Sequence, residues 1–244
     1  MRLPVHNPLR LVLRRIDAFV FPPLCIVCDR PRPDYDRWLC EECRDEITSR
    51  ITRRDACPKC GQNRSIRTCT CDIAWDYPFS RIRSFVDYND TVKSIMQQIK
   101  YQGKCNLAEY IGRLCGSHLE ADEYTGAVAV PIPLHRRRRR KRGYNQAEWF
   151  ARGLFADASA CAVTTTVLQR VRSTGTQTKL DRSQRQRNLA GAFSLTREGP
   201  AMIAGRKVLL VDDVITTGAT TMAAATILLE GGCSDVEVIS FARD

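Results

Sequence analysis

The stretch Val208–Thr220 reads VLLVDDVITTGAT, and it decides the fold class of this 244-residue chain. Its first half predicts a buried strand over Lys207–Val211 that ends at two adjacent acids, Asp212 and Asp213. Its second half turns into an apolar helix, predicted over residues 219–230 and ended by two glycines. Ligands of open α/β folds bind at the carboxyl ends of the strands. The stretch therefore predicts a ligand site at the edge of a sheet.

The residue types in this stretch suit a phosphorylated sugar. Two adjacent carboxylates can accept hydrogen bonds from a ribose diol, and they lie close to any divalent metal that the ligand carries. Hydroxyls and backbone N–H groups at a helix N-terminus can hold a 5′-phosphate, and here they come from Thr216, Thr217, Gly218, Ala219 and Thr220. The alternative is a plain strand and helix with two acids in the turn, but it does not explain why acids, hydroxyls and glycine share one register.

Strands and helices alternate along the chain before this stretch. The patterns predict strands over residues 83–88, 127–134 and 163–169, and helices over 90–101, 106–119 and 145–155. Asp90 is the candidate cap of the first helix, and a last strand is predicted over 235–242. The alternation predicts an α/β fold with a mainly parallel sheet flanked by helices on both faces.

Seven consecutive basic residues, 136–142, follow the strand predicted over 127–134. This basic loop is expected at the same edge of the sheet as the acid pair, where arginine can contact a pyrophosphate through two nitrogens. A solvated charge run or a patch for a nucleic-acid backbone are the alternatives. The net charge of +11 and the pI of about 9.3 favour an anionic partner.

Residues 173–192 are polar, basic and poor in apolar side chains. Such a stretch inside a domain is typical of a mobile functional loop. It is expected to close over the ligand and exclude water, with Arg182, Arg185 and Arg187 as its cations. A disordered basic surface segment is the alternative.

Eight of the twelve cysteines lie within residues 25–71. Two CxxC pairs separated by eleven residues predict a tetrathiolate zinc site with the ligands Cys25, Cys28, Cys40 and Cys43. A CxxC and a CxC predict a second site with the ligands Cys57, Cys60, Cys69 and Cys71. The alternatives are one zinc ion shared by both halves, and redox dithiols. Because every candidate ligand is a cysteine, the expected role is structural.

The N-terminal residues do not resemble a secretory signal, because Arg14, Arg15 and Asp17 interrupt the apolar positions. No apolar run approaches the roughly 18 residues that a membrane span needs. We expect a cytoplasmic protein. Residues 8–21 predict a short helix packed on the body of the protein. The alternative, a basic amphipathic helix on a membrane surface, would place the protein peripherally at the inner membrane.

The stretch Val208–Thr220 resembles the signature of the type I phosphoribosyltransferases, which bind phosphoribosyl pyrophosphate with magnesium. Together with the cysteine pairs, further motifs make residues 25–244 similar to the ComF family. These motifs are Pro131-Ile132-Pro133-Leu134, Arg140-Lys141-Arg142-Gly143-Tyr144-Asn145-Gln146, Gln177-Thr178-Lys179-Leu180, Arg185, Arg187 and Asn188. The CxC pair and the long arginine run depart from the family pattern.

The resemblance implies a phosphoribosyltransferase fold joined to a double zinc ribbon, and a role in handling DNA during natural transformation, or competence. It divides the chain into an N-terminal extension (1–24), the zinc-ribbon module (25–72) and the phosphoribosyltransferase-like domain (80–244). By the same resemblance, Asp212 and Asp213 hold the ribose hydroxyls, and residues 216–220 hold the 5′-phosphate. The residues expected to act in catalysis are Asp212, Asp213 and Arg142. Those expected on the pyrophosphate or in the flap are Arg140, Arg142, Asn145, Gln146, Arg185 and Arg187.

Two hypotheses about function follow. The first is a phosphoribosyltransferase, a glycosyltransferase of unidentified acceptor, or a hydrolase that releases pyrophosphate from the same ligand. Magnesium and arginine would then stabilise the leaving pyrophosphate. The second is a non-catalytic protein that binds a phosphoribosyl ligand or single-stranded DNA, with DNA-uptake proteins as partners. Aromatic side chains available for base stacking are Tyr35, Trp38, Trp75, Tyr77, Tyr144 and Trp149, of which Trp149 is expected to pack inside its helix.

Overall fold

The computed structural model describes residues 22–32, 38–52, 55–66, 68–69, 71, 77–157, 161–172 and 191–244. They divide between two compact units whose boundary falls after Ile47, within helix α2 (Glu41–Thr52). The helix predicted over 8–21 and nearly all of the loop predicted over 173–192 lie outside the described residues.

The larger unit is built on a five-stranded sheet whose strand order is β1-β7-β6-β2-β3. All four neighbouring pairs of strands are parallel. The strands are β1 (Arg81–Asp87), β2 (Val128–Pro131), β3 (Ala162–Val163), β6 (Lys207–Ile215) and β7 (Asp235–Arg243). The central strand β6 buries Val208–Val211 without a break, as a strand covered on both faces requires. The predicted α/β fold with a parallel sheet is confirmed.

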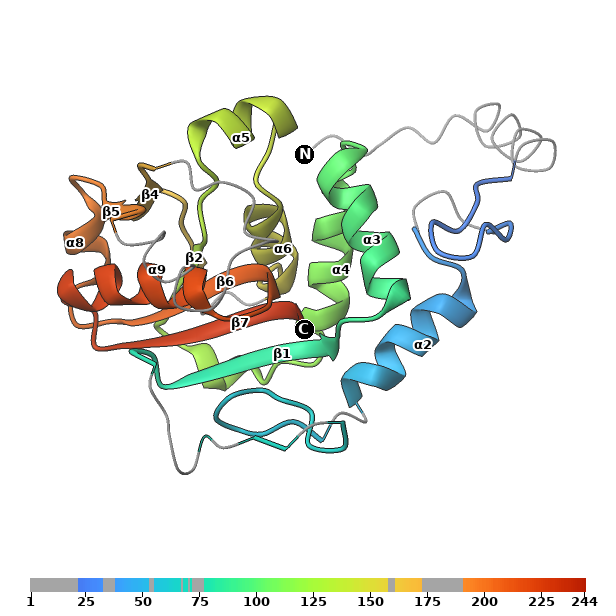
Figure 1. The fold of residues 1–244 in the computed structure, drawn as a ribbon, viewed down its shortest axis with the longest axis horizontal. Helices are drawn as coiled ribbons and strands as arrows, with labels where there is room; N and C mark the ends of the chain where they lie inside the picture. The colour runs from blue at the N-terminus through green and yellow to red at the C-terminus, as the bar shows by residue number, and fades with distance from the viewer. Residues whose placement is uncertain are drawn as a thin grey trace, which may run out of the picture. The chain divides into compact units, whose positions relative to one another are not determined.

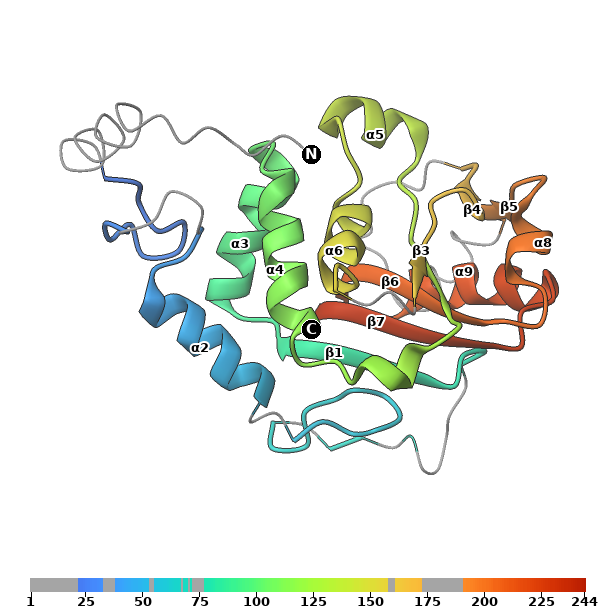
Figure 2. The ribbon, with the colours of Figure 1, turned by 180° about the vertical axis from the view of Figure 1, so that it is seen from behind.

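Helices cover both faces of the sheet (Figures 1 and 2). Helix α9 (Ala219–Glu230) packs on one face, against β6 and β7. Helices α4 (Cys105–Gly116) and α6 (Gln146–Leu154) cover the other face, and α3 (Asp90–Tyr101) lies beside α4. Shorter elements include the 3-10 helix η1 (Ala121–Tyr124), the helix α8 (Gly199–Ile203), and a small antiparallel pair, β4 (Leu168–Arg170) and β5 (Phe193–Leu195).

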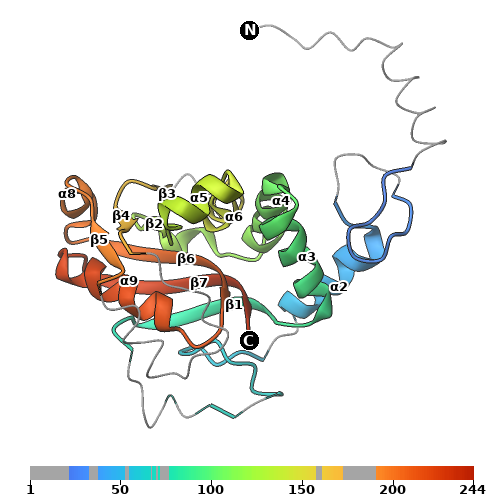
Figure 3. The same ribbon diagram turned by 45° about the horizontal axis from the view of Figure 1, so that its top comes forward.

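The basic run 136–142 is a helix, α5 (Arg136–Arg142), and the prediction of a loop there was wrong. Arginine and lysine are good helix formers, which outweighs their mutual repulsion over so short a length. His135 caps the helix by accepting a hydrogen bond from the Arg137 N–H, and Gly143 ends it in the left-handed conformation at φ 85°. Figures 1 and 3 show α5 at the outside of the unit, joined to α6 by a short connection.

Two smaller predictions also need correction. Asn89, not Asp90, caps α3, since its side-chain oxygen accepts the Val92 N–H at 2.9 Å. The strand predicted over 163–169 is two short strands, β3 and β4, which belong to different sheets. Three consecutive threonines, Thr164–Thr166, lie between these two strands.

Helices α4 and α6 touch backbone to backbone. A Cβ atom on Gly153 of α6 would lie 2.0 Å from the Glu109 carbonyl oxygen, and one on Gly112 of α4 would lie 2.3 Å from the Phe150 carbonyl oxygen. Real Cβ atoms do not approach backbone so closely, so only glycine fits at these positions. This close packing sets the position of α6, whose N-terminus lies beside the acid pair, as described below.

Gly153→Ala is expected to destabilise the protein, although the same change inside an isolated helix gains roughly 1 kcal/mol. Overpacking usually costs about 1–3 kcal/mol, and a Cβ only 2.0 Å from a carbonyl oxygen places this site at the upper end, so the cost exceeds that gain. Thermal unfolding should therefore begin several degrees lower, at about 2–4 °C per kcal/mol. Asn106→Ala, at an exposed position of α4, is the control. An unchanged or higher melting temperature for Gly153→Ala would show that the two helices separate without cost.

Candidate ligand site at the carboxyl edge of the sheet

The acid pair lies where β6 extends beyond its neighbour β2. Strand β2 pairs with β6 only as far as Pro131 opposite Val211, whereas β7 accompanies β6 to Ile215. Asp212 and Asp213 are therefore still inside β6, but the strand on one side has already ended. The strand is four residues longer than the sequence pattern predicted, and the backbone around both acids is held by β7.

The two acids have different surroundings. Asp213 is buried, and its Oδ2 lies 2.6 Å from Nζ of Lys100, the next-to-last residue of α3. Asp212 is half-buried, and its Oδ1 accepts the backbone N–H of Asp213 at 2.8 Å. Burial raises the pKa of Asp212, and the charge of Asp213 raises it further. Burial also acts to raise the pKa of Asp213, but the Lys100 ammonium outweighs it and the pKa lies below the usual value.

The turn after β6 has the geometry of an anion cradle. Gly218 adopts a left-handed conformation at φ 75° and begins α9, whose first N–H groups have no partner inside the helix. Thr216 is exposed, and Thr217 and Thr220 are half-buried. Tyr77 packs on the other side, with its ring 3.3 Å from where a Cβ of Gly218 would lie. The predicted phosphate loop is thus assembled around one glycine at a helix N-terminus.

Cations surround this edge of the sheet. The residues 136–141 of α5 are all exposed, and Arg142 is half-buried. Next to α5 lies a groove of about 590 Å³ whose lining includes Arg136, Arg139, Arg170 and Thr196. A groove of this size accommodates a small molecule or part of a polymer. Arg170 is within electrostatic reach of Asp212, so the groove and the acid pair belong to one charged region.

The amino edge of the same sheet is electrically different, because its cations are paired with acids. Arg81 contacts both Glu123 and Glu237, and Lys207 Nζ lies 2.5 Å from the fully buried Glu237. At the carboxyl edge, Lys100 is paired with Asp213 and Arg139 lies 3.5 Å from Glu148, but α5 adds a run of exposed cations. Excess positive charge collects at the carboxyl edge, where an anionic ligand of the predicted kind would lie.

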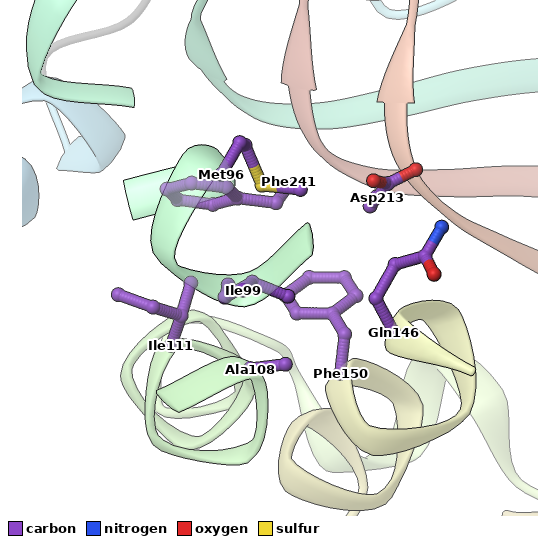
Figure 4. Close-up of a pocket in the computed structure, with 8 residues that line it drawn as sticks. All are labelled: Met96, Ile99, Ala108, Ile111, Gln146, Phe150, Asp213 and Phe241. Atoms are coloured by element: carbon purple, nitrogen blue, oxygen red, sulfur yellow. The ribbon is translucent and has the colours of Figure 1, made fainter. Parts of the chain in front are cut away.

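The residues predicted to contact pyrophosphate take different places. Arg142 donates a hydrogen bond to Gln146, which is buried beside Asp213 (Figure 4). Asn145 is buried, caps α6 by accepting the Ala147 N–H, and donates to the Ile132 carbonyl oxygen at 3.0 Å. Arg140 is on the exposed part of α5. Asn145 therefore fixes α6 to the end of β2, and its contact with ligand stays a prediction. Arg185 and Arg187 lie outside the described residues.

Two cations of this region were missed by sequence reasoning. Lys100 has no local signal, because it occupies an ordinary position in the last turn of an amphipathic helix. Arg170 ends β4, with its guanidinium 5.2 Å from the ring centre of Phe193 in β5. Both residues reach the site only through tertiary packing, so no sequence spacing indicates them.

The four cysteines of the first predicted zinc site come together in the smaller unit. Their Sγ atoms all lie within 4.8 Å of one another, and Cys28 Sγ is 3.6 Å from Cys40 Sγ. Four thiolates at about 2.3 Å from a zinc ion lie roughly 3.8 Å apart, so this group fits a tetrahedral zinc ion. Burial acts to raise the pKa of Cys25, but backbone N–H groups from Cys40, Val27 and Cys28 lower it to about 7 and favour the thiolate.

The four cysteines of the second predicted site form an equivalent group in the larger unit. The Sγ atoms of Cys57, Cys60, Cys69 and Cys71 also lie within 4.8 Å of one another. The two groups share their local fold: the chain brackets each knuckle with an antiparallel bridge, Leu24 with Pro31 and Ala56 with Asn63. Each unit therefore holds a complete set of four thiols, and the set fits zinc whether its second pair is CxxC or CxC.

The second cysteine group also supports the sheet. The Ile82 N–H of the edge strand β1 donates to the Lys59 carbonyl oxygen at 2.7 Å, and Asn63 donates to Asp87 at 2.6 Å. Gly61 has φ 67°, and a Cβ there would lie 2.7 Å from the Ile82 carbonyl oxygen. The hairpin around Cys57 thus covers part of an edge strand that would otherwise present unpaired backbone groups.

Comparison with known proteins agrees with this architecture. The double zinc ribbon domain family matches residues 16–73, and the phosphoribosyl transferase domain family matches residues 140–244. The chain is therefore a phosphoribosyltransferase-fold protein with a double zinc ribbon. More particularly, it belongs to the ComF/YhgH family.

Relatives that match over most of the chain support this family assignment. The chain is 31% identical over 231 residues to "DNA utilization protein YhgH" of Salmonella typhimurium, which covers 91% of this chain and 97% of that protein. It is 28% identical over 233 residues to "Competence protein F" of Haemophilus influenzae, covering 90% and 96%. It is 25% identical over 228 residues to "Competence protein ComFC" of Bacillus subtilis, covering 86% and 90%.

Solved structures give weaker likenesses. A hypoxanthine phosphoribosyltransferase from Staphylococcus aureus aligns with a TM-score of 0.37 and 15% identity over 56% of this chain and 63% of that one. The allosteric regulatory enzyme of purine biosynthesis aligns with a TM-score of 0.39 and 17% identity over 59% and 30%. The assignment therefore depends on the family matches. Among the described residues, no helix has the length and apolar character of a membrane span.

Zinc content distinguishes two separate sites from one shared site. Purified wild-type protein should contain about two zinc ions per chain by plasma mass spectrometry, since each set of four thiols suits one ion. Cys43→Ser and Cys71→Ser should each lower the content to about one, because each removes a ligand from a different group. Cys105→Ser, outside both groups, is the control. A shared ion would instead give about one in the wild type and none in either variant.

Proposed function

We propose that this protein binds phosphoribosyl pyrophosphate with magnesium at the carboxyl edge of its sheet, and that it acts as a phosphoribosyltransferase. The observation that carries the proposal is the joint placement of the acid pair in β6, the glycine turn at the start of α9, and the cations of α5. An acceptor for ribose hydroxyls, a donor set for a phosphate and positive charge for a pyrophosphate lie along one edge.

Each part of the ligand has a matching group of residues. The ribose hydroxyls would donate to Asp212 and Asp213, and the 5′-phosphate would lie on the N–H groups and hydroxyls of residues 216–220. Arg142 is the cation of α5 that is tied to the acid-pair side, through Gln146. It would contact the pyrophosphate as this group leaves the anomeric carbon, where it offsets the developing negative charge.

Magnesium would arrive bound to the pyrophosphate. The carboxylates of Asp212 and Asp213 are suitable ligands for it. Carboxylate oxygens are hard ligands, and magnesium is commonly held by one or two carboxylates together with substrate phosphates. When bound, the ion would neutralise charge on the departing pyrophosphate. The protein's own residues hold the ribose and the phosphate in place, and the flap predicted over 173–192 would exclude water.

Titration calorimetry with phosphoribosyl pyrophosphate and magnesium tests the proposal. Wild-type protein should bind the ligand, and Asp212→Asn or Asp213→Asn should weaken binding at least about tenfold, since each removes a charged hydrogen-bond acceptor. Asp157→Asn, at an exposed acid outside the site, should bind like the wild type. If the wild-type protein gives no binding up to millimolar ligand, the proposal is wrong.

A second candidate function is binding of single-stranded DNA. Six consecutive exposed basic residues on α5, beside a groove of about 590 Å³, favour it. Phosphate backbones bind such surfaces without regard to sequence. The names of the relatives, "DNA utilization protein" and "Competence protein", point the same way. We propose on this ground that the protein serves DNA uptake and processing in the cytoplasm, with the phosphoribosyl site beside a strand-binding surface.

Stacking contributes less to this second candidate than charge does. Of the aromatic side chains proposed from the sequence, Tyr77 packs on the phosphate loop, and Tyr144 donates its hydroxyl to the Ile99 carbonyl oxygen. Trp149 is half-buried, and the Arg152 guanidinium lies 5.5 Å from its ring centre. Trp38 is half-buried as well. Tyr35 and Trp75 lie outside the described residues.

Fluorescence anisotropy with a labelled single-stranded oligonucleotide across a range of salt concentrations tests this candidate. Replacing Arg136, Arg137 and Arg138 with Gln should weaken binding and make the salt dependence less steep, by about one unit of log–log slope for each phosphate that these arginines neutralise. Asp157→Asn should leave both unchanged. An affinity that does not vary with salt in the wild type would contradict binding to the phosphate backbone.

A further inference from the structure

Lys100 forms an ion pair with Asp213 of the acid pair, and it comes from a helix outside the phosphoribosyltransferase motifs. Its Nζ lies 2.6 Å from Asp213 Oδ2. Its side chain is 27% exposed and that of Asp213 is 10% exposed, so the pair is largely removed from water. At this length the contact is a close ion pair between an ammonium group and a carboxylate. It fixes one oxygen of a carboxylate that the proposed function assigns to the ribose.

The surroundings of Asp213 explain why the carboxylate needs a cation. Figure 4 shows the carboxylate at the end of a cavity walled by Met96 and Ile99 of α3, Phe150 of α6 and Phe241 of β7. The cavity measures about 10 Å³, which leaves room for no more than about one water molecule. Apart from Gln146, which lies beside the carboxylate, the other side chains that line this cavity are apolar. An ionised carboxylate in such surroundings costs free energy unless it is paired.

Hydrogen bonds from neighbouring segments fix the C-terminal turn of α3, which carries Lys100. The Tyr144 hydroxyl, in the connection between α5 and α6, donates to the Ile99 carbonyl oxygen. Lys104 Nζ donates to Gln98 Oε1 at 2.5 Å. Burial acts to lower the pKa of Lys100, and the positive charge of Arg142 acts to lower it as well. The negative charges of the acid pair outweigh both, so the pKa of Lys100 lies above its usual value. Lys100 thus lies within electrostatic reach of both the acid pair and the cation proposed to contact the pyrophosphate.

We propose that Lys100 is a positioning residue of the phosphoribosyl site, whose ammonium group holds the Asp213 carboxylate ionised and correctly oriented for the ribose hydroxyls. The inference rests on the proposed function. Lys100 contacts one Asp213 oxygen, and a carboxylate has about four lone-pair positions, so acceptor capacity remains for a ligand. Asp212 is oriented separately, by the backbone N–H of Asp213. The pair is thereby pinned from two directions before ligand arrives, which reduces the ordering cost of binding.

The test is a double-mutant cycle on ligand affinity, using wild type, Lys100→Met, Asp213→Asn and the double variant. Calorimetry with phosphoribosyl pyrophosphate and magnesium should show binding weakened by about 10- to 100-fold in Lys100→Met, the range usual for losing a group that orients a ligand-binding side chain. Lys100→Arg should recover most of this loss, because it restores the charge. In the Asp213→Asn background, Lys100→Met should change affinity less than about twofold, because it acts through Asp213.

Lys93→Met is the matched control: it is the same substitution at an exposed position of the same helix, and it should bind like the wild type. Thermal unfolding of every variant verifies folding. Independent, multiplying effects in the cycle, or wild-type affinity in Lys100→Met, would overturn the positioning role. Tighter binding by Lys100→Met would also overturn it, since Lys100 would then block the site. Absence of binding in the wild type would instead overturn the proposed function, and the role of Lys100 with it.

Discussion

The parallel pairing of β6 between β2 and β7 is the constraint on which the rest of the structure depends. Because β2 stops opposite Val211 while β7 continues to the end of β6, the two acids lie in a strand with one neighbour missing. The backbone there is held rigidly, yet one side is open to α6 and the turn before α9. A site of this kind is more precise than one placed on a loop, because the sheet fixes the side chains that begin it.

Charge is arranged around this sheet in two ways. At the amino edge, acids such as Glu237 neutralise the cations within the fold, and their contribution is to packing and stability. At the carboxyl edge, α5 presents a series of exposed cations. Repulsion within such a helix is tolerated because it is short and capped at both ends. An anionic ligand or a nucleic-acid strand would reduce that repulsion, which makes this edge the natural place for either proposed partner.

The cysteine-rich segment does more than carry metal. Its second half belongs to the same compact unit as the sheet and hydrogen-bonds to β1. A segment with so few large apolar residues cannot bury a core of its own, so four thiols that fit zinc hold its hairpin in shape. The hairpin then covers an edge strand. The same knuckle is used twice, and only the second copy needs glycine, at Gly61, where the backbone of β1 approaches.

By itself the sequence determined the α/β class, the strand and helix on either side of the turn at residues 216–218, and both sets of cysteines. Each depends on residues close together in the chain, whose periodicity or spacing reports their geometry. It was misleading for the basic run 136–142, which was predicted as a loop because of its charge, although its residues favour a helix and both ends are capped. Only the tertiary structure decided that Lys100 meets Asp213, that Arg170 lines the groove, and that Asn145 is used to anchor α6. Such contacts join elements far apart in the chain, and only packing brings them together.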